Sequence, residues 1–195
     1  MRRVVGVLLT VLGLTLAGVP VAELVMEHHE TAQAQQRLRA QVPEQAVVRG
    51  GNAVPVAHPV PVGHALVEMR IPRFGESWSW VASEGTSQSV LADGPGHYPQ
   101  TPLPGQRGNV SFAAHRAGHG DPFLDFDRLR PGDVVELRQG QTTWTYVIDI
   151  DPKIVPASAA WVLDPLPGRQ LTLTTCWPKY GSSKRMYVRA HLSSA

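Results

Sequence analysis

Cysteine is nearly absent from this chain, because only one of its 195 residues, Cys176, is a cysteine. A single cysteine excludes an internal disulfide. It also leaves neither a Cys-x-x-Cys motif nor a second thiol to resolve a mixed disulfide, which disfavours a thiol redox protein. Cys176 is then either a small buried side chain, as free cysteines often are, or a usable thiol.

Charge is also scarce. Asp, Glu, Lys and Arg together make up 17% of the residues, and the formal net charge is +2. The Lys and Arg residues do not run together into a basic tract, so nothing in the charge pattern favours nucleic acid as a partner.

Metal ligands are poorly placed. His115 and His119 have the i,i+4 spacing of a helical zinc site. However, Gly118, Gly120 and Pro122 disfavour a helix there, and no third ligand is evident. We therefore expect neither a metal nor another cofactor.

The one long apolar run lies at the N-terminus. Arg2 and Arg3 precede residues 4–22, which carry no charge. As a helix this run would be about 28 Å long, close to the roughly 30 Å hydrocarbon core of a bilayer. A cleaved signal peptide is the alternative, but its apolar core is usually shorter. We predict that residues 1–22 form a cytoplasmic tip and a single-pass plasma-membrane signal anchor, with the rest of the chain extracellular.

Residues 23–63 have the composition of a connector. Residues 23–41 lack Gly and Pro and predict a helix that is polar on most sides, which we interpret as a spacer. Residues 42–63 contain four prolines and predict a semi-extended linker that holds the next domain away from the bilayer.

The globular domain spans residues 64–195, where strand-like segments alternate with Gly and Pro. The expected strands are residues 65–71, 79–83, 109–115, 133–138, 143–149, 170–176 and 185–191. Only residues 123–130 resemble a helical turn or two. Many short strands with little helix predict an all-β, closed or nearly closed barrel.

Period-2 alternation assigns the side chains of these strands to faces. Leu171 and Leu173 share one face, and Cys176 lies on the other. His115 and Arg185 also fall on the more polar faces of their strands. All three side chains should therefore point away from the predicted core, which weakens the buried-cysteine interpretation.

The spacing of these residues suggests chemistry. If the strands flanking Pro178 and Gly181 pair antiparallel, Cys176 and Arg185 face each other with Cβ atoms about 5 Å apart. A guanidinium there favours the thiolate and can stabilise an oxyanion. A histidine, with an unperturbed pKa of about 6.5, would handle the proton. His115 is the best-placed candidate, although a histidine hydrogen-bonded at a strand end remains the simpler interpretation from spacing alone.

Several motifs, which occur along the chain in the order of the family, resemble the sortase signature. They are Thr-Leu-Thr-Thr-Cys at residues 172–176, Lys-Arg-Met-Tyr-Val-Arg at 184–189, Pro-Gly-Gln-Arg-Gly-Asn-Val at 104–110, Ala-His-Arg at 114–116, and the segment 91–99. The Trp-Pro-Lys-Tyr that follows the cysteine is most similar to class E sortases of high-GC Gram-positive bacteria.

The resemblance implies a closed eight-stranded sortase-type β-barrel with short helical turns, and a cysteine transpeptidase. Cys176 would be the nucleophile and His115 the general acid/base. Arg185 would bind substrate and stabilise the oxyanion, and Thr175 would line the groove. Ala114 departs from the glycine usual in the family, so its methyl group could narrow the substrate groove.

The implied reaction cleaves a C-terminal Leu-Ala-x-Thr-Gly or Leu-Pro-x-Thr-Gly motif of a secreted protein between Thr and Gly, through a cysteine thioester. An amino group of a peptidoglycan precursor, lipid II, then accepts the protein. A sortase that polymerises pili, using a pilin lysine as acceptor, is one alternative. A non-catalytic cell-envelope binding module on the same fold is another.

Overall fold

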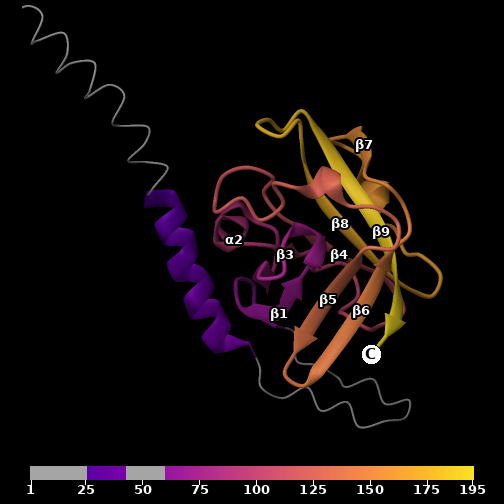
Figure 1. Ribbon diagram of the computed structural model, residues 1–195, viewed down its shortest axis with the longest axis horizontal. Coiled ribbons are helices and arrows are strands. Elements are labelled where there is room, and N and C mark those ends of the chain that lie inside the picture. The colour runs from indigo at the N-terminus through magenta and orange to yellow at the C-terminus, as the bar shows by residue number, and fades with distance from the viewer. Residues whose placement is uncertain (1–25, 43–59) are drawn as a thin grey trace, which may run out of the picture.

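The computed structural model describes residues 26–42 and 60–195 (Figure 1). A helix of residues 26–41 precedes a β-rich domain. The domain contains strands and short helices in the order β1 (Ala65–Arg70), η1 (Pro72–Phe74), β2 (Ser79–Glu84), α2 (Gln88–Asp93), β3 (Gly96–His97), β4 (Gly108–Ala113), η2 (Phe126–Arg128), β5 (Val134–Gln139), β6 (Thr142–Ile148), β7 (Lys153–Pro156), η3 (Ala160–Leu163), β8 (Arg169–Trp177) and β9 (Lys184–Ser194).

The strands form a closed barrel. The hydrogen-bonded order is β6-β5-β1-β2-β3-β4-β8-β9, and β9 pairs again with β6, which closes a ring of eight strands. The ninth strand, β7, pairs only with residues 184–187 at the N-terminal end of β9. The predicted closed eight-stranded barrel is therefore confirmed, with β7 as an addition.

Every predicted strand is present to within a few residues, but the sequence did not predict β3, α2 or β7. Strand β3 has only two residues, too few for any periodicity, and it lies in a Gly- and Pro-rich stretch. Its Gly96 permits a close backbone approach, because an added Cβ would lie 2.2 Å from the Gly85 carbonyl oxygen. Helix α2 is short and is capped by Ser87, whose hydroxyl accepts a hydrogen bond from the Val90 amide.

The barrel interior holds the alternating apolar residues that the sequence assigned to the core. Leu171 and Leu173 of β8, Phe112 of β4 and Val188 of β9 are all buried in one cluster. The outer face of β4 and β8 is also buried, contrary to the expectation that it points away from the packed interior. Its side chains Asn109, Ser111, Thr172 and Thr174 are at most 3% exposed.

The burial of this polar face is possible because its groups are hydrogen-bonded. Asn109 donates to the carbonyl oxygens of Val162 and Asp164, around the end of η3. Its own side-chain oxygen accepts from Thr172. The segment around η3 therefore covers the outer face of β4 and β8.

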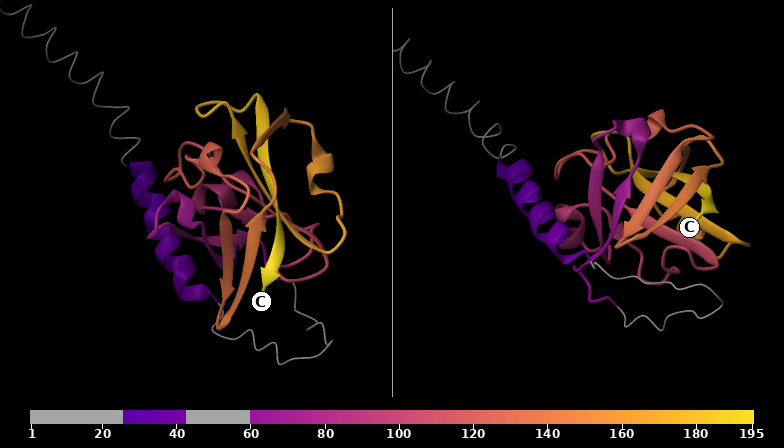
Figure 2. Two further views of the ribbon diagram at one scale, coloured as in Figure 1. Left: turned by 45° about the vertical axis from the view of Figure 1, so that its right-hand side comes forward. Right: turned by 60° about the horizontal axis from the view of Figure 1, so that its bottom comes forward.

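The helix of residues 26–41 lies along one side of the barrel (Figure 2). Ala34 and Leu38 are buried against the domain. Gln35 donates to the carbonyl oxygens of Val81 and Asp93 and accepts from the Val81 amide. The sequence predicted this helix, but the interpretation as a polar spacer is wrong for residues 26–41, because one helical face packs on the domain.

The predicted signal anchor, residues 4–22, lies outside the described residues, as does most of the linker. Within residues 26–42 and 60–195, no helix combines the length and apolarity needed to cross a bilayer.

Candidate active site

Strand β8 lies between two partners that carry the other candidate residues. It runs parallel to β4 and antiparallel to β9. In the antiparallel pairing, Cys176 lies directly opposite Arg185. Opposed residues project from the same face of a sheet, so the thiol and the guanidinium lie on the same side.

His115 follows the end of β4 and continues its register. The last ladder pair is Ala113 with Thr174. Beyond it, the Ala114 amide donates to the Thr174 carbonyl oxygen at 3.2 Å, the bond expected if Ala114 pairs with Thr175. One step further along this register, His115 lies beside Cys176.

The next residues support this register from the opposite face of the sheet. The guanidinium carbon of Arg116 lies 4.8 Å from the ring centre of Trp177. His115, Cys176 and Arg185 therefore form a row across three adjacent strands, with the cysteine in the middle. Neighbouring strands lie about 4.8 Å apart, so both outer residues are direct neighbours of Cys176, although no hydrogen bond joins their side chains to the thiol within the described residues.

The three side chains line one cavity of about 770 Å³. Ala114 and Thr175 line it as well. The Thr175 hydroxyl donates to the Ala114 carbonyl oxygen at 2.8 Å, so it already has a partner within the protein. Contact of these two residues with substrate stays a prediction.

A second cavity of about 250 Å³ lies beside the first, between β9 and the segment from β7 to η3. Tyr98, Thr174 and Arg185 line both cavities. The Tyr98 hydroxyl is hydrogen-bonded to Thr174 at 3.1 Å. The sequence analysis identified Arg185 but not Tyr98. Tyr98 lies in a Gly- and Pro-rich stretch with no periodic pattern, so the direction of its side chain could not be predicted.

The environment of His115 favours the neutral imidazole. Burial is the largest cause that lowers the pKa of His115 below its ordinary value, and the neighbouring His119 lowers it further. The carboxylate of Glu27 opposes both effects. The buried Nε2 atom has no hydrogen-bond partner within the described residues. At neutral pH this imidazole can therefore accept a proton.

Arg185 is held by its own loop. Its Nη1 donates to the carbonyl oxygens of Ser182 and Lys184, at 2.9 and 3.0 Å. Within residues 60–195, its Nε and Nη2 make no hydrogen bond. These donors are available to an oxyanion formed next to Cys176.

His119 and Glu27 neighbour His115 outside the lining of the cavity. The rings of His115 and His119 lie 4.7 Å apart between centres. The sequence analysis weighed these two histidines together only as possible metal ligands. Across the residues that the structure describes, no group of three or more His, Cys, Asp or Glu side chains is arranged to hold a metal ion. Glu27 lies far away in the chain and carries no motif that could have indicated it.

Arg116→Ala should lower the free energy of unfolding by about 2–3 kcal/mol. The side chain of Arg116 is 1% exposed, pairs with Asp127 at 2.7 Å and lies over Trp177. Urea denaturation would measure the loss. The matched control is Arg128→Ala, which breaks an exposed i,i+3 pair with Asp125 and should cost less than about 0.5 kcal/mol. If both variants lost the same free energy of unfolding, the contact of Arg116 with Trp177 would not stabilise the ends of β4 and β8.

Comparison with known proteins shows which family the chain belongs to. A family model described as the sortase domain matches residues 69–193. Sortase SrtE1 of Streptomyces coelicolor is 36% identical over 123 residues, which are 55% of this chain and 35% of that protein. The chain thus spans about a third of the length of that relative.

Solved structures give the same result for the barrel. Sortase E from Streptomyces avermitilis is 44% identical, with a TM-score of 0.65, and the match covers 69% of this chain and 91% of that one. Sortase E1 from Streptomyces coelicolor, solved with a tripeptide in its active site, is 30% identical with a TM-score of 0.61, over 68% and 90% of the two chains. The chain therefore belongs to the sortase family and resembles its class E members.

Proposed function

We propose that this protein is a transpeptidase that cleaves a Leu-Ala-x-Thr-Gly or Leu-Pro-x-Thr-Gly sorting motif between Thr and Gly. It transfers the secreted protein to an amino group of a peptidoglycan precursor. The observation that carries the proposal is the row of His115, Cys176 and Arg185 on three adjacent strands facing one cavity.

The first half of the reaction forms a thioester. The neutral imidazole of His115 accepts the thiol proton of Cys176 as Sγ attacks the carbonyl carbon of the threonine. Arg185 donates hydrogen bonds to the oxyanion that develops. The intermediate collapses, the bond between this carbon and the glycine nitrogen breaks, and His115 gives its proton to the departing amine.

The second half reverses these roles. The acceptor amine attacks the thioester carbonyl carbon, and His115 takes a proton from the attacking nitrogen. Arg185 again stabilises the oxyanion, and the carbon–sulfur bond breaks. The proton returns from His115 to the sulfur of Cys176, which leaves a new amide and the enzyme in its starting state.

The two adjoining cavities suit an extended peptide. They meet at Tyr98, Thr174 and Arg185, which line both cavities. A chain crossing this junction would present one peptide bond to Cys176 while neighbouring side chains occupy both hollows. The tripeptide in the active site of the Streptomyces coelicolor enzyme supports a peptide ligand here.

In this proposal, residues 1–22 anchor the enzyme in the plasma membrane and the barrel works on its extracellular side. The described part of the docked helix starts at residue 26, four residues after the predicted anchor ends. Because this helix packs on the domain, it would keep the barrel close to the bilayer. A free spacer followed by a linker would allow a greater distance.

The test is the thioester itself. Full-length enzyme in detergent is incubated with a Leu-Ala-x-Thr-Gly peptide and, separately, with the Leu-Pro-x-Thr-Gly form. Intact mass spectrometry should detect a hydroxylamine-sensitive adduct of the peptide up to its threonine. Transfer of the acyl group to a pilin lysine peptide, and not to a peptidoglycan amine, would favour the pilus-assembling alternative. Absence of the adduct with both peptides would favour a non-catalytic binding module.

A further inference from the structure

The turn after His115 has an unusual backbone. Four successive residues, Gly118, His119, Gly120 and Asp121, have φ angles of 86°, 52°, 74° and 57°. Two of them are not glycine, and non-glycine residues in this region are uncommon and strained. Such strain persists only where surrounding contacts over-determine the conformation.

Some of these contacts come from within the turn. The side chain of Asp121 accepts a hydrogen bond from the Gly118 amide at 2.7 Å, and the Asp121 amide donates to the Gly118 carbonyl oxygen. The Phe123 amide then donates to the carbonyl oxygen of His115, which closes the loop. These bonds fix the shape of the turn but not the direction of the His119 ring.

The remaining contacts come from the docked helix. The Oε1 atom of Glu27 accepts a hydrogen bond from the His119 amide at 2.6 Å and lies 3.3 Å from His119 Nδ1. The turn approaches so closely that a Cβ added at Gly118 would lie 3.1 Å from the same oxygen. At Gly120 an added Cβ would lie 2.7 Å from the ring of Trp80 and 3.4 Å from Thr31 of the helix.

The helix itself is fixed on the barrel, so Glu27 is not carried on a loose arm. Thr31 donates to the Ala92 carbonyl oxygen, one turn after Glu27. Further along, Arg39 pairs with Glu68 of β1 and donates to Ser79 of β2. These contacts hold the helix that carries Glu27 against the same barrel that carries His115.

We propose that Glu27 is a positioning residue. It holds the left-handed turn of residues 118–121, so that the His119 ring packs against the His115 ring and fixes its orientation. This inference rests on the proposed function, because it takes His115 as the acid/base of the transpeptidation. It makes the first turns of the N-terminal helix part of the active site. A barrel that starts at residue 64 would lack this support.

The charges around His115 give the proposal a second readout. Glu27 on the helix favours the imidazolium form of His115, and His119 on the turn disfavours it. Cys176 and Arg185 face the same cavity from β8 and β9. Glu27→Gln keeps an oxygen acceptor for the His119 amide but removes the negative charge. It should therefore lower the pKa of His115 and move the acid limb of kcat/KM to lower pH.

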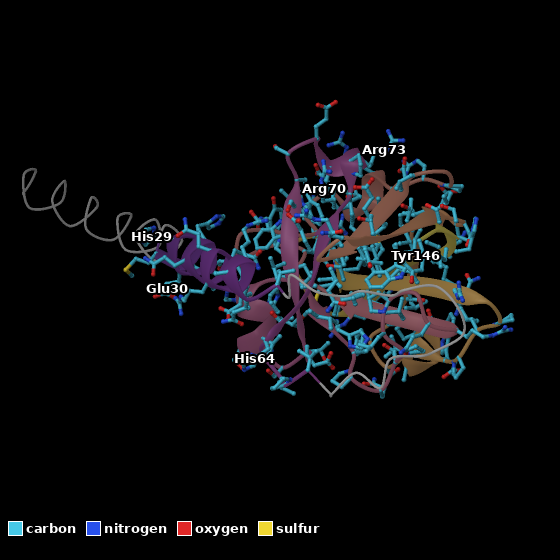
Figure 3. The ribbon with its side chains drawn as sticks, turned by 90° about the horizontal axis from the view of Figure 1, so that it is seen from below. His29, Glu30, His64, Arg70, Arg73 and Tyr146 are labelled. Carbon is cyan, nitrogen blue, oxygen red and sulfur yellow. The ribbon has the colours of Figure 1, made fainter. Side chains whose placement is uncertain are left out.

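The experiment compares Glu27→Gln, Glu27→Ala and Glu30→Ala in the full-length chain. Glu30 is an exposed carboxylate on the same helix, close to His29 (Figure 3). Glu27→Ala should lower kcat by about 10-fold to 100-fold while leaving KM within about 2-fold, and Glu30→Ala should match wild type. Glu27→Gln should keep most of kcat. Equal kcat and equal pH profiles for Glu27→Ala and Glu30→Ala would overturn the proposal.

Two measurements do not require turnover and separate this inference from the proposed function. NMR titration of the His115 ring should show the lowered pKa in Glu27→Gln. Hydrogen exchange of the His119 amide should be at least about 10-fold faster in Glu27→Ala than in Glu30→Ala. If wild-type enzyme forms the acyl adduct but neither NMR property changes, the positioning role fails alone. If both change but no adduct forms, only the proposed function fails.

Discussion

Cys176→Ala should reduce cleavage of a sorting-motif peptide by about 10⁴-fold or more, because removal of a catalytic nucleophile leaves only binding and oxyanion stabilisation. Cys176 is the only cysteine in the chain, so no other thiol can replace it. The rate of peptide cleavage and the mass of the enzyme after incubation with peptide measure the effect. No acyl adduct should form with the variant.

The fold provides the control for this substitution. Cys176 is partly exposed near the end of β8, and alanine keeps the β-carbon, so the barrel should remain intact. The circular dichroism spectrum and the midpoint of thermal unfolding should match those of wild type within a few degrees. Wild-type turnover by a folded Cys176→Ala protein would exclude the covalent mechanism.

The strands were predictable because their signals are local. The Leu and Thr alternation at the end of β8 assigned Leu171 and Leu173 to the interior, where they lie. The register between β4 and β8 could not be derived in this way. It joins His115 to a residue about sixty positions further along the chain, and no local pattern specifies which residues of two parallel strands face each other.

The cover over the outer face of the barrel was missed for a related reason. Thr172 and Thr174 have the polar character expected of a solvent-facing surface, and they are buried only because Tyr98 and the η3 segment pack over them. The η3 segment is apolar but only four residues long, and Tyr98 lies in a Gly- and Pro-rich stretch, so neither shows a periodic pattern. Polar atoms satisfied by distant backbone groups leave no periodic signal in the sequence.

The docking face of the N-terminal helix illustrates the same limit. Its buried residues, Thr31, Ala34, Gln35 and Leu38, have the i, i+3, i+4, i+7 spacing of one helical face. Two of the four are polar, so the face lacks a hydrophobic stripe. Gln35 is buried because it satisfies the backbone of Val81, a contact that only the folded barrel supplies. The sequence therefore predicted the helix and missed its partner.

Arg185→Ala should lower the rate of acyl-enzyme formation by about 10²-fold to 10³-fold, the loss typical of an oxyanion donor. Arg185 lies opposite Cys176 and lines both cavities, while its Nη1 is anchored on the carbonyl oxygens of its own loop. Single-turnover mixing of enzyme with peptide measures this step separately from transfer to the amine. Arg185→Lys should recover only part of the rate, because an ammonium keeps the charge but not the planar donors.

Lys184→Ala is the matched control, since it removes an adjacent, exposed cation from the same strand. Alternation along β9 directs its side chain to the opposite face from Arg185, so its loss tests the general effect of positive charge near the thiol. If the donors of Arg185 stabilise the oxyanion, Lys184→Ala should change the acylation rate by less than about 3-fold, within the range of a screened surface charge. Equal losses for the two variants would reduce Arg185 to a source of electrostatic potential. An unchanged rate in Arg185→Ala would remove it from the site and leave the oxyanion to other donors near Cys176.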